Sequence, residues 1–386
     1  GARIELGDGQ VLAVGSVAVT DGKITAVQEG ELNPGGEVTV IDGKGKTVTP
    51  GFVETWTQLG LYEVGAEDST VDSYYEGSAI TPALDAADAF HPHSHRIPLQ
   101  RVHGITTVVA SPTGGLIAGQ GFRFDLTNNP MATPGVAMFG AANSQTKASF
   151  GGNRAGLWLR LRELVDDAEF YQANQSSINI GQSRPLSLGR LHLAALQKVL
   201  SGNQPLVMTA YKESDIRALI GWQQSLGEAG KNLRIILAGG NEAWLVAPEL
   251  KQAGIPVIVN PTDQVPFSFD ATKSRDDNAA ILARAGVKVI LSSHSWMNNL
   301  RRLRQEAGIA VSYGFPRNQA LAAITSVPAL AFGLDDVGEL SPGKKANLVL
   351  WSGDPFEMLS VAERIFIDGR EQDLTTRQKL LAKRYH

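Results

Sequence analysis

Seven short apolar runs, separated by stretches with helical periodicity, fill the middle of the sequence between residues 52 and 292. This alternation is typical of a parallel β-sheet whose strands are joined by crossover helices. We expect the strands at residues 52–56, 105–110, 136–140, 206–210, 233–238, 257–260 and 287–292. We expect the helices at about residues 154–172, 187–200, 214–229, 242–253, 276–285, 298–307 and 316–326.

The number of strands bears directly on the fold class. A closed (β/α)8 barrel contains eight parallel strands, and only seven are recognisable here. The segment 154–201 is long and helical and contains no clear strand, so we place a lost, distorted or unrecognised fourth strand there. The predicted fold is therefore α/β, a (β/α)8-like TIM barrel that is distorted if this strand is missing.

Strand-like segments near the two ends of the chain predict a second, smaller domain. They lie at residues 17–20, 23–27, 346–351 and 364–369. The first two flank Asp21-Gly22, which is a strong signal for a two-residue hairpin. The predicted domains are a composite small β-sandwich of residues 1–50 and 335–374, a barrel of residues 51–334, and a basic surface helix in the tail 375–386.

The composition excludes several classes of function. The net charge of the 386 residues is -4, which gives no reason to expect nucleic acid or an anionic membrane as a partner. The absence of cysteine rules out disulfides, thiolate metal sites and a cysteine nucleophile. No apolar run is long enough to span a membrane. We expect a soluble protein whose partner is a small-molecule ligand or substrate. Its compartment stays open, either cytoplasmic or exported after loss of an N-terminal signal.

Two motifs flank the predicted barrel, and two shorter ones follow in the same order. They are Asp42–Phe52 (DGKGKTVTPGF), Gly338–Trp351 (GELSPGKKANLVLW), Gly353-Asp354-Pro355 and Ile367-Asp368-Gly369-Arg370. With these motifs the whole chain resembles the amidohydrolase superfamily, in particular its imidazolonepropionase-like members. The motifs belong to the β-domain and its junctions, so the resemblance speaks for the fold more than for the chemistry. It also implies a hydrolase of non-peptide C–N bonds in cyclic amides or small peptide-like substrates, and self-association into a homo-oligomer.

The positions that carry metal ligands in this family hold other residues here. Trp56 and Gln58 stand where the first barrel strand has a His-x-His pair, Thr209 and Gly239 or Gly240 replace two further histidines, and His294 replaces an aspartate. Alternate residues of a strand share a face, but an indole only donates hydrogen bonds and an amide oxygen is a weak ligand. A catalytic zinc needs about three protein ligands. We therefore predict a degenerate metal site, no cofactor, and the absence of the zinc that is typical of the family.

His294 is the candidate catalytic residue, because it lies at the end of the last predicted strand, where barrel enzymes place catalytic groups. It would serve as a general base or as a lone ligand. The alternative is a histidine that is hydrogen-bonded inside a filled barrel mouth. The candidate substrate-binding residues are Trp56, Gln58, Thr209, Tyr211, Gly239, Gly240 and Glu242. For Glu242 the alternative is a favourable charge near a helix N-terminus.

Three further segments contain residue types that bind ligands. The cluster His91-Pro92-His93-Ser94-His95 could bind a metal, although its place before a predicted outer helix favours a solvated loop. The glycine-rich segment 114–121 has no Gly-Lys-Ser/Thr, which argues against a phosphate-binding P-loop and for a tight loop on the functional face of the barrel. The polar run 143–147 follows the next strand and would line the same face.

Two hypotheses of function follow. In the first, the chain is a hydrolase without the usual metals, in which His294 is the base and Gln58, Thr209 and backbone N–H groups near Gly239 polarise the carbonyl. In the second, it is a catalytically silent pseudoenzyme whose barrel survives as a small-molecule binding or interaction module, with Trp56 partly filling the mouth. Ligand binding without turnover distinguishes the second from the first.

Overall fold

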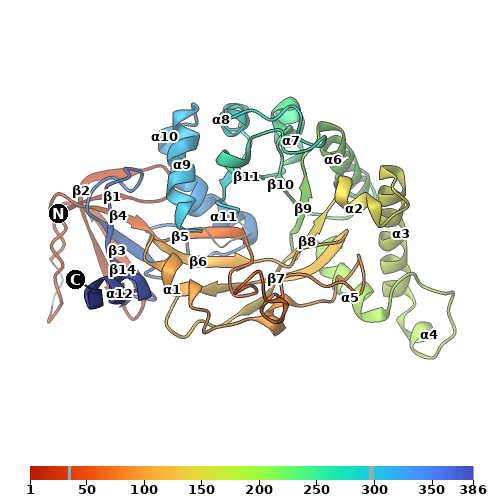
Figure 1. Cartoon of the computed structure of the whole chain (residues 1–386), viewed down its shortest axis with the longest axis horizontal. Coiled ribbons are helices and arrows are strands. Elements are labelled where there is room, and N and C mark those ends of the chain that lie inside the picture. The colour runs from red at the N-terminus through yellow and green to blue at the C-terminus, as the bar shows by residue number, and fades with distance from the viewer. Residues whose placement is uncertain (34–35, 295–299, 386) are drawn as a thin grey trace.

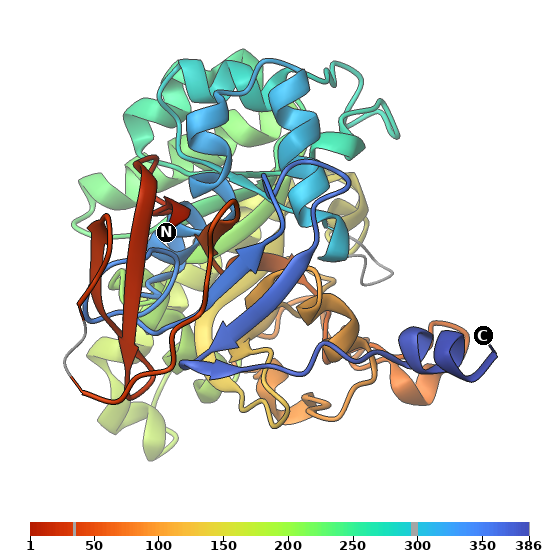
Figure 2. The same cartoon turned by 90° about the vertical axis from the view of Figure 1, so that its left-hand side faces the viewer.

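The computed structural model describes residues 1–33, 36–294 and 300–385. These form two sheets, and most of the helices lie around the sheet formed by the middle of the chain (Figure 1). Sheet A combines strands from both ends of the chain. They are β1 (Ala2–Glu5), β2 (Val11–Thr20), β3 (Lys23–Glu29), β4 (Thr47–Pro50), β13 (Leu348–Trp351), β14 (Ala362–Ile367) and β15 (Arg370–Glu371). Their order is β15-β14-β13-β4-β1-β2-β3. Figure 2 shows the red N-terminal strands and the blue C-terminal strands side by side.

Local sequence explains how sheet A is built. The β2–β3 hairpin turns at Asp21 and Gly22, whose φ angles of 50° and 80° suit the type I′ geometry that favours Asp-Gly. β4 pairs antiparallel with β13, with Thr49 opposite Val349, and this pairing joins the two ends of the chain. The seven strands from the two ends of the chain all belong to this one sheet, so the predicted two-layered sandwich is not confirmed. The predicted domain boundaries remain a prediction.

Sheet B contains eight strands. They are β5 (Phe52–Thr57), β6 (Ile105–Ala110), β7 (Ile117–Asp125), β8 (Thr133–Ala141), β9 (Leu206–Ala210), β10 (Ile235–Gly239), β11 (Val257–Val259) and β12 (Val289–Leu291), in that order across the sheet. All seven strands expected from the sequence are therefore present. β5 and β12 are the two end strands and are not paired with each other in the described part of the chain, so sheet B is a half-barrel and a complete TIM barrel is not confirmed.

The eighth strand, β7, corrects two expectations. It occupies the segment that we expected to be a tight glycine-rich loop, and it runs antiparallel to both β6 and β8. Glycine is required within it, because a Cβ on Gly121 would lie 2.4 Å from the Phe139 ring and 2.5 Å from the Ala110 carbonyl oxygen. The segment 154–201, where we placed the missing strand, contains three helices and no strand.

Helices follow most strands of sheet B. They are α1 (Arg96–Arg101), α2 (Ser144–Ala148), α3 (Arg154–Ala173), α4 (Gln175–Asn179), α5 (Arg190–Leu200), α6 (Glu213–Glu228), α7 (Ala247–Ala253), α8 (Asn278–Arg284), α9 (Leu303–Ser312), α10 (Arg317–Ala320), α11 (Ser326–Phe332) and, in the tail, α12 (Arg377–Tyr385). Of the expected helix 298–307, residues 298 and 299 lie outside the described residues. No described helix is long and apolar enough to cross a membrane.

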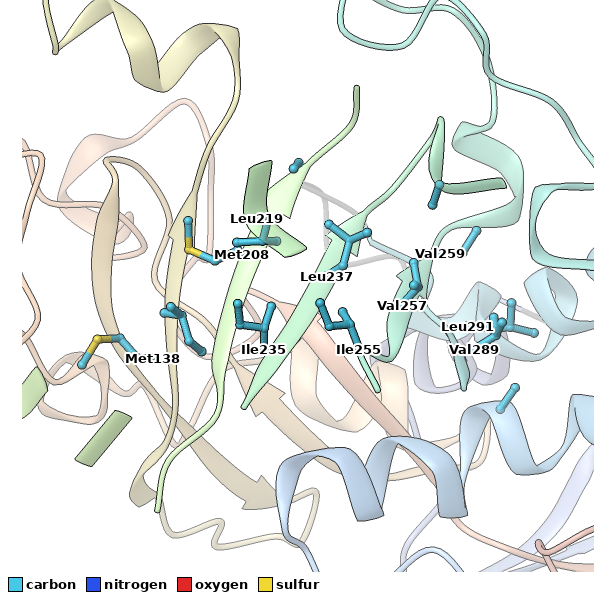
Figure 3. Close-up of a cluster of buried hydrophobic side chains, with 14 of the residues drawn as sticks. Met138, Met208, Leu219, Ile235, Leu237, Ile255, Val257, Val259, Val289 and Leu291 are labelled. Carbon is cyan, nitrogen blue, oxygen red and sulfur yellow. The ribbon is translucent and has the colours of Figure 1, made fainter. Parts of the chain in front are cut away.

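The two faces of sheet B are both apolar, which explains why its parallel strands read as nearly continuous hydrophobic runs. Met208 and Leu237 belong to the outer face, which packs against helices such as α6 (Figure 3). Val207 and Ile236 point to the inner face, where Phe332 of α11 joins the same cluster. Each large apolar side chain buried in this way contributes about 1.5–3 kcal/mol. This packing holds the carboxyl ends of the strands together at one edge of the sheet.

Candidate functional site at the carboxyl ends of the strands

A buried carboxylate links the two end strands of sheet B. Glu54 of β5 is fully buried and accepts hydrogen bonds from the Ser292 hydroxyl (2.7 Å), the Ser293 hydroxyl (2.7 Å) and the Ser293 N–H (2.9 Å) just after β12. The N–H groups of Thr55 and Trp56 donate to the same carboxylate. Burial raises the pKa of Glu54, although these hydrogen bonds oppose the shift. Glu54 therefore links β5 to the end of β12, where no backbone pairing joins the two strands, and no pattern in the sequence signals this role.

Next to this link, the two ring systems of Trp56 and His294 stack face to face. Their centroids are 3.5 Å apart and their planes are inclined by 14°. The backbone of His294 is held by two further hydrogen bonds, from its N–H to Ser292 Oγ (3.0 Å) and from Asn260 Nδ2 to its carbonyl oxygen (3.3 Å). Two residues that the sequence predicted separately, 238 positions apart, are thus brought into direct contact.

The surroundings of His294 fix its charge. Burial lowers its pKa to about 4, while a hydrogen bond with the Trp56 backbone works in the opposite direction. The ring is therefore neutral near pH 7. Its Nδ1 is buried and has no hydrogen-bond partner among the described residues. A neutral imidazole has one nitrogen that only accepts, so the site contains an unused acceptor at the end of β12.

The ends of β9 and β10 are shaped by Tyr211 and two glycines. Gly239 has a φ of 87°, and a Cβ at this position would lie 2.5 Å from Cε1 of the Tyr211 ring. Gly240 also has a positive φ, of 55°, and its N–H donates to the Ala210 carbonyl oxygen. The Tyr211 ring therefore fills the space that any side chain at position 239 would need. Phe267 meets this ring edge-on, with centroids 5.1 Å apart and an angle of 88°.

Glu242 is buried and its carboxylate is fully used within the protein. One oxygen accepts from the Glu213 N–H (3.0 Å) at the N-terminus of α6, and the other accepts from the Lys273 N–H (3.0 Å) and the Thr272 hydroxyl (3.3 Å). An acidic group at a helix N-terminus is stabilising. The contacts therefore favour the structural alternative for this residue, although the helix it serves is α6 and not the one that follows it.

Gln58 and Thr209 are less defined by their contacts. Gln58 lies one residue beyond β5 and is buried, whereas Thr209 lies on β9 and is half-buried. Neither side chain hydrogen-bonds to another described residue. The pairing of β5 with β6 shifts between Glu54 and Thr57, and an extra residue of this kind changes which side chains share a face. Because of this shift, and because Gln58 lies beyond the end of β5, strand alternation alone does not place Gln58 on the same face as Trp56.

A clamp of charged residues links the first turns of α3 and α6 and the start of α2 to the segment between β11 and α8. Arg154, at the start of α3, donates through Nε to Asp215 of α6 (2.7 Å) and through Nη2 to Asp270 (2.6 Å). Asp270 also accepts from the Ser144 N–H (2.7 Å) at the start of α2. Burial alone would raise the pKa of Asp270. The hydrogen bonds from Ser144 and the charge of Arg154 outweigh this effect, so the pKa of Asp270 is lowered. Only the polar run 143–147 signalled this cluster in the sequence.

Another buried carboxylate lies near the ends of β11 and β12. Glu306 of α9 is fully buried and accepts from the N–H (3.1 Å) and the hydroxyl (3.0 Å) of Thr262, which follows β11. Arg302 Nη2 lies 3.0 Å from the same carboxylate. Burial raises the pKa of Glu306 to about 7 despite these contacts. The sequence does not single out this residue, because a glutamate in the first turn of a helix carries no special pattern.

The three histidines of segment 91–95 do not converge on a common point. His91 Nε2 lies 2.8 Å from Asp72, and His95 Nδ1 lies 2.7 Å from Glu63, while His93 is exposed. The two rings thus bind different carboxylates of the long β5–α1 connection. This arrangement fits the solvated-loop alternative better than a metal site.

The donor set at the carboxyl ends of the strands does not suit the zinc that the fold family implies. Trp56 and His294 stack on each other, the Tyr211 ring covers Gly239, and Thr209 offers only a hydroxyl. Within residues 1–33, 36–294 and 300–385, no three His, Asp or Glu side chains are grouped so that they could hold a metal ion. Residues 295–299, Ser-Trp-Met-Asn-Asn, contribute no imidazole or carboxylate to this set. An indole, a glycine and a single hydroxyl are not among the ligands that zinc prefers, and the degenerate metal site stays a prediction.

Comparison with known proteins agrees with the fold. The protein-family model of the amidohydrolase family matches residues 230–376 of this chain. Amidohydrolase tasK of Hapsidospora irregularis is 22% identical over 399 residues, which cover 93% of this chain and 40% of that protein. The chain thus spans about 40% of the length of this curated relative.

Solved structures of amidohydrolases and related hydrolases share the fold over nearly the whole chain. An amidohydrolase from Thermotoga maritima MSB8 has a TM-score of 0.84 and 26% identity, covering 96% of this chain and 97% of that one. Molinate hydrolase has a TM-score of 0.55 and 16% identity, covering 97% and 94%, and this likeness concerns the fold alone. The chain is therefore similar to the amidohydrolase family over residues 230–376 and to a solved amidohydrolase over nearly its whole length. These matches support the family and do not select the imidazolonepropionase-like subgroup.

Proposed function

We propose that this amidohydrolase-family chain binds a small amide-type molecule, a cyclic amide or a short peptide-like compound, at the carboxyl ends of the strands of sheet B. The face-to-face stack of Trp56 on His294 carries this proposal. It occupies the region where the family resemblance implies metal ligands, and it leaves His294 Nδ1 as a buried acceptor without a partner. An amide N–H is a suitable donor to such an acceptor. Placement at the strand ends agrees with where α/β folds bind ligands.

The proposal includes a degenerate metal site. One imidazole and one threonine hydroxyl are too few ligands for zinc, and the carboxylates nearby are already bound within the protein. The test uses tag-free protein purified without a nickel column and measures its metal content by plasma mass spectrometry. We expect far less than one transition metal per chain. One tightly held zinc, iron or manganese per chain would contradict the degenerate site.

Ligand binding is tested by NMR titration with a panel of small amides and cyclic amides. The ligand signals give the affinity for every variant, and the His294 ring signals are an additional readout in the wild type. We expect saturable shifts of the ring signals by some members of the panel. His294→Phe keeps an aromatic ring against Trp56 but has no acceptor, so it separates loss of the Nδ1 contact from loss of packing. Absence of binding by every member, or unchanged affinity in His294→Phe, would refute the role given to this residue.

A second candidate is metal-independent hydrolysis, and the unpartnered lone pair of His294 is the observation that favours it. In this reaction water attacks the amide carbonyl carbon while His294 Nδ1 takes one water proton. The proton then passes to the leaving nitrogen as the C–N bond breaks, giving a carboxylic acid and an amine. A pKa of about 4 makes His294 a weak base at neutral pH. Turnover of the same panel, followed by NMR and abolished in His294→Ala, would place this candidate ahead of simple binding.

A further inference from the structure

The segment between β11 and α8 exposes an unusual group of apolar side chains close to Tyr211. Val265 is 51% exposed, Phe267 54% and Phe269 89%, within five consecutive residues. Leaving a phenylalanine in water forfeits a large part of the stabilisation that its burial would give. Exposed apolar side chains gathered in one place are typical of binding surfaces.

The aromatic segment is continuous with the strand-end site. Phe267 meets the ring of Tyr211 edge-on, and the Tyr211 ring in turn lies over Gly239 at the end of β10. A ligand at the ends of the strands would thus meet an aromatic wall made of Tyr211 and Phe267, with Phe269 two residues further along the chain. Edge-to-face and offset contacts of this kind favour a further aromatic ring over a saturated one.

The segment that carries Phe267 and Phe269 is held in place by contacts with other parts of the protein. Asp270 follows Phe269 directly and is held by Ser144 N–H at 2.7 Å and by Arg154 Nη2 at 2.6 Å. Arg154 is fixed in turn by Asp215 of α6. These charge-assisted hydrogen bonds keep the segment in place against the strand ends. A wall held in this way binds a ligand without a large additional loss of conformational freedom.

Tyr211 also supplies a polar group. Its hydroxyl has no hydrogen-bond partner in the described part of the chain. Burial, together with the negative charges of Asp263 and Asp270, raises the pKa of Tyr211 to about 12. The phenol therefore keeps its proton at neutral pH and is available as a hydrogen-bond donor. A carbonyl oxygen is the acceptor that an amide-type ligand would offer.

We infer that the ligand is an aromatic amide, whose ring packs against Phe267 and Phe269 and whose carbonyl oxygen accepts a hydrogen bond from the Tyr211 hydroxyl. This inference rests on the proposed function, because it names the chemical class of the ligand for the same site. It adds a requirement that the proposed function does not contain, namely an aromatic ring in the ligand.

The test compares two probes that differ only in the ring, N-acetyl-L-phenylalaninamide and N-acetyl-L-cyclohexylalaninamide, by NMR titration of the full chain. We expect the phenyl probe to bind about three- to tenfold more tightly, as one favourable aromatic contact allows. Phe269→Ala should remove most of this difference. Tyr211→Phe should weaken both probes by about three- to tenfold, because it deletes one hydrogen bond and keeps the ring.

Leu359→Ala is the matched control, since Leu359 is 94% exposed in the connection between β13 and β14 of sheet A. It should change neither affinity. Phe269→Ala should keep the thermal midpoint of the wild type, because so exposed a side chain adds little to folding. Equal affinities of the two probes, or an unchanged ratio in Phe269→Ala, would overturn the inference while amide binding at His294 still stands. If neither probe nor any other small amide binds, the proposed function fails as well.

Discussion

Replacing Gly239 by alanine would drive a methyl group into the ring of Tyr211. The new Cβ would lie 2.5 Å from Cε1 and 2.7 Å from Cδ1 of that ring, whereas carbon atoms in contact are normally about 3.5–4.0 Å apart. The backbone adds a second penalty, because Gly239 has a φ of 87°. A left-handed conformation costs an L-residue about 1–2 kcal/mol, and overpacking costs about 1–3 kcal/mol. We therefore expect Gly239→Ala to lower the free energy of unfolding by about 2–5 kcal/mol.

Two further variants separate these penalties. Gly254, the residue after α7, has a φ of 66°, but a Cβ there would meet nothing within 4 Å. Gly254→Ala should therefore cost only the backbone term of about 1–2 kcal/mol. In a Tyr211→Ala background, Gly239→Ala should cost about 1–3 kcal/mol less than in the wild type, because the ring is gone.

Urea denaturation of the four proteins in this double-mutant cycle measures the coupling between the two positions. If Gly239→Ala costs the same with and without the Tyr211 ring, and no more than Gly254→Ala, the ring does not fill the space beside position 239. Our explanation for the missing side chain at the end of β10 would then be wrong.

Three other predictions concern charged groups. The pKa of His294 is lowered to about 4, so the stability that this residue contributes is present above pH 6.5 and is lost as the pH falls toward 4. In His294→Phe the free energy of unfolding should change less over this range. Parallel pH curves of the wild type and this variant would contradict the prediction. Because burial raises the pKa of Glu306 to about 7, the wild type should lose up to about 3 kcal/mol as the pH rises from 4.5 through 7, and Glu306→Gln should not show this loss. Arg154→Ala should destabilise the protein by about 2–3 kcal/mol, because it leaves the buried carboxylates of Asp215 and Asp270 without this partner. It should also speed hydrogen exchange of the Ser144 N–H, which donates to Asp270. Unchanged exchange would show that Arg154 does not hold this segment in place.

The sequence predicted most of sheet B, because strands that are buried on both faces consist of continuous apolar runs. The limits at 105–110 and 206–210 agree with β6 and β9 to the residue. β7 was missed because its glycines interrupt the pattern of a strand. These glycines are required by the close approach of Phe139 and the Ala110 carbonyl oxygen, which are contacts between distant segments that no local pattern reveals.

The candidate site was predictable only in part, for the same reason. The positions of Trp56 and His294 followed from their places at strand ends, but their stacking depends on how β5 and β12 meet. The roles of Glu54, Glu306 and Asp270 depend on donors from other segments, and an isolated acidic residue in a sequence does not specify its donors. At Gly239, the sequence predicted that a metal-binding side chain of the family is missing. Only the position of the Tyr211 ring explains why no side chain fits at this position.

The pairing of β4 with β13 also sets the order in which the chain can fold during synthesis. β4 can pair early with β1, but β4 ends at Pro50 and β13 begins at Leu348, so the ribosome must add roughly 300 residues before β4 can pair with β13. At typical rates of translation this takes roughly 15–60 s. Throughout that interval β4 has an unpaired edge, which is the kind of surface that leads to aggregation. Sheet A is therefore the part of the nascent protein in which a chaperone would have the most to protect, even though it lies away from the strand ends where the ligand is proposed to bind.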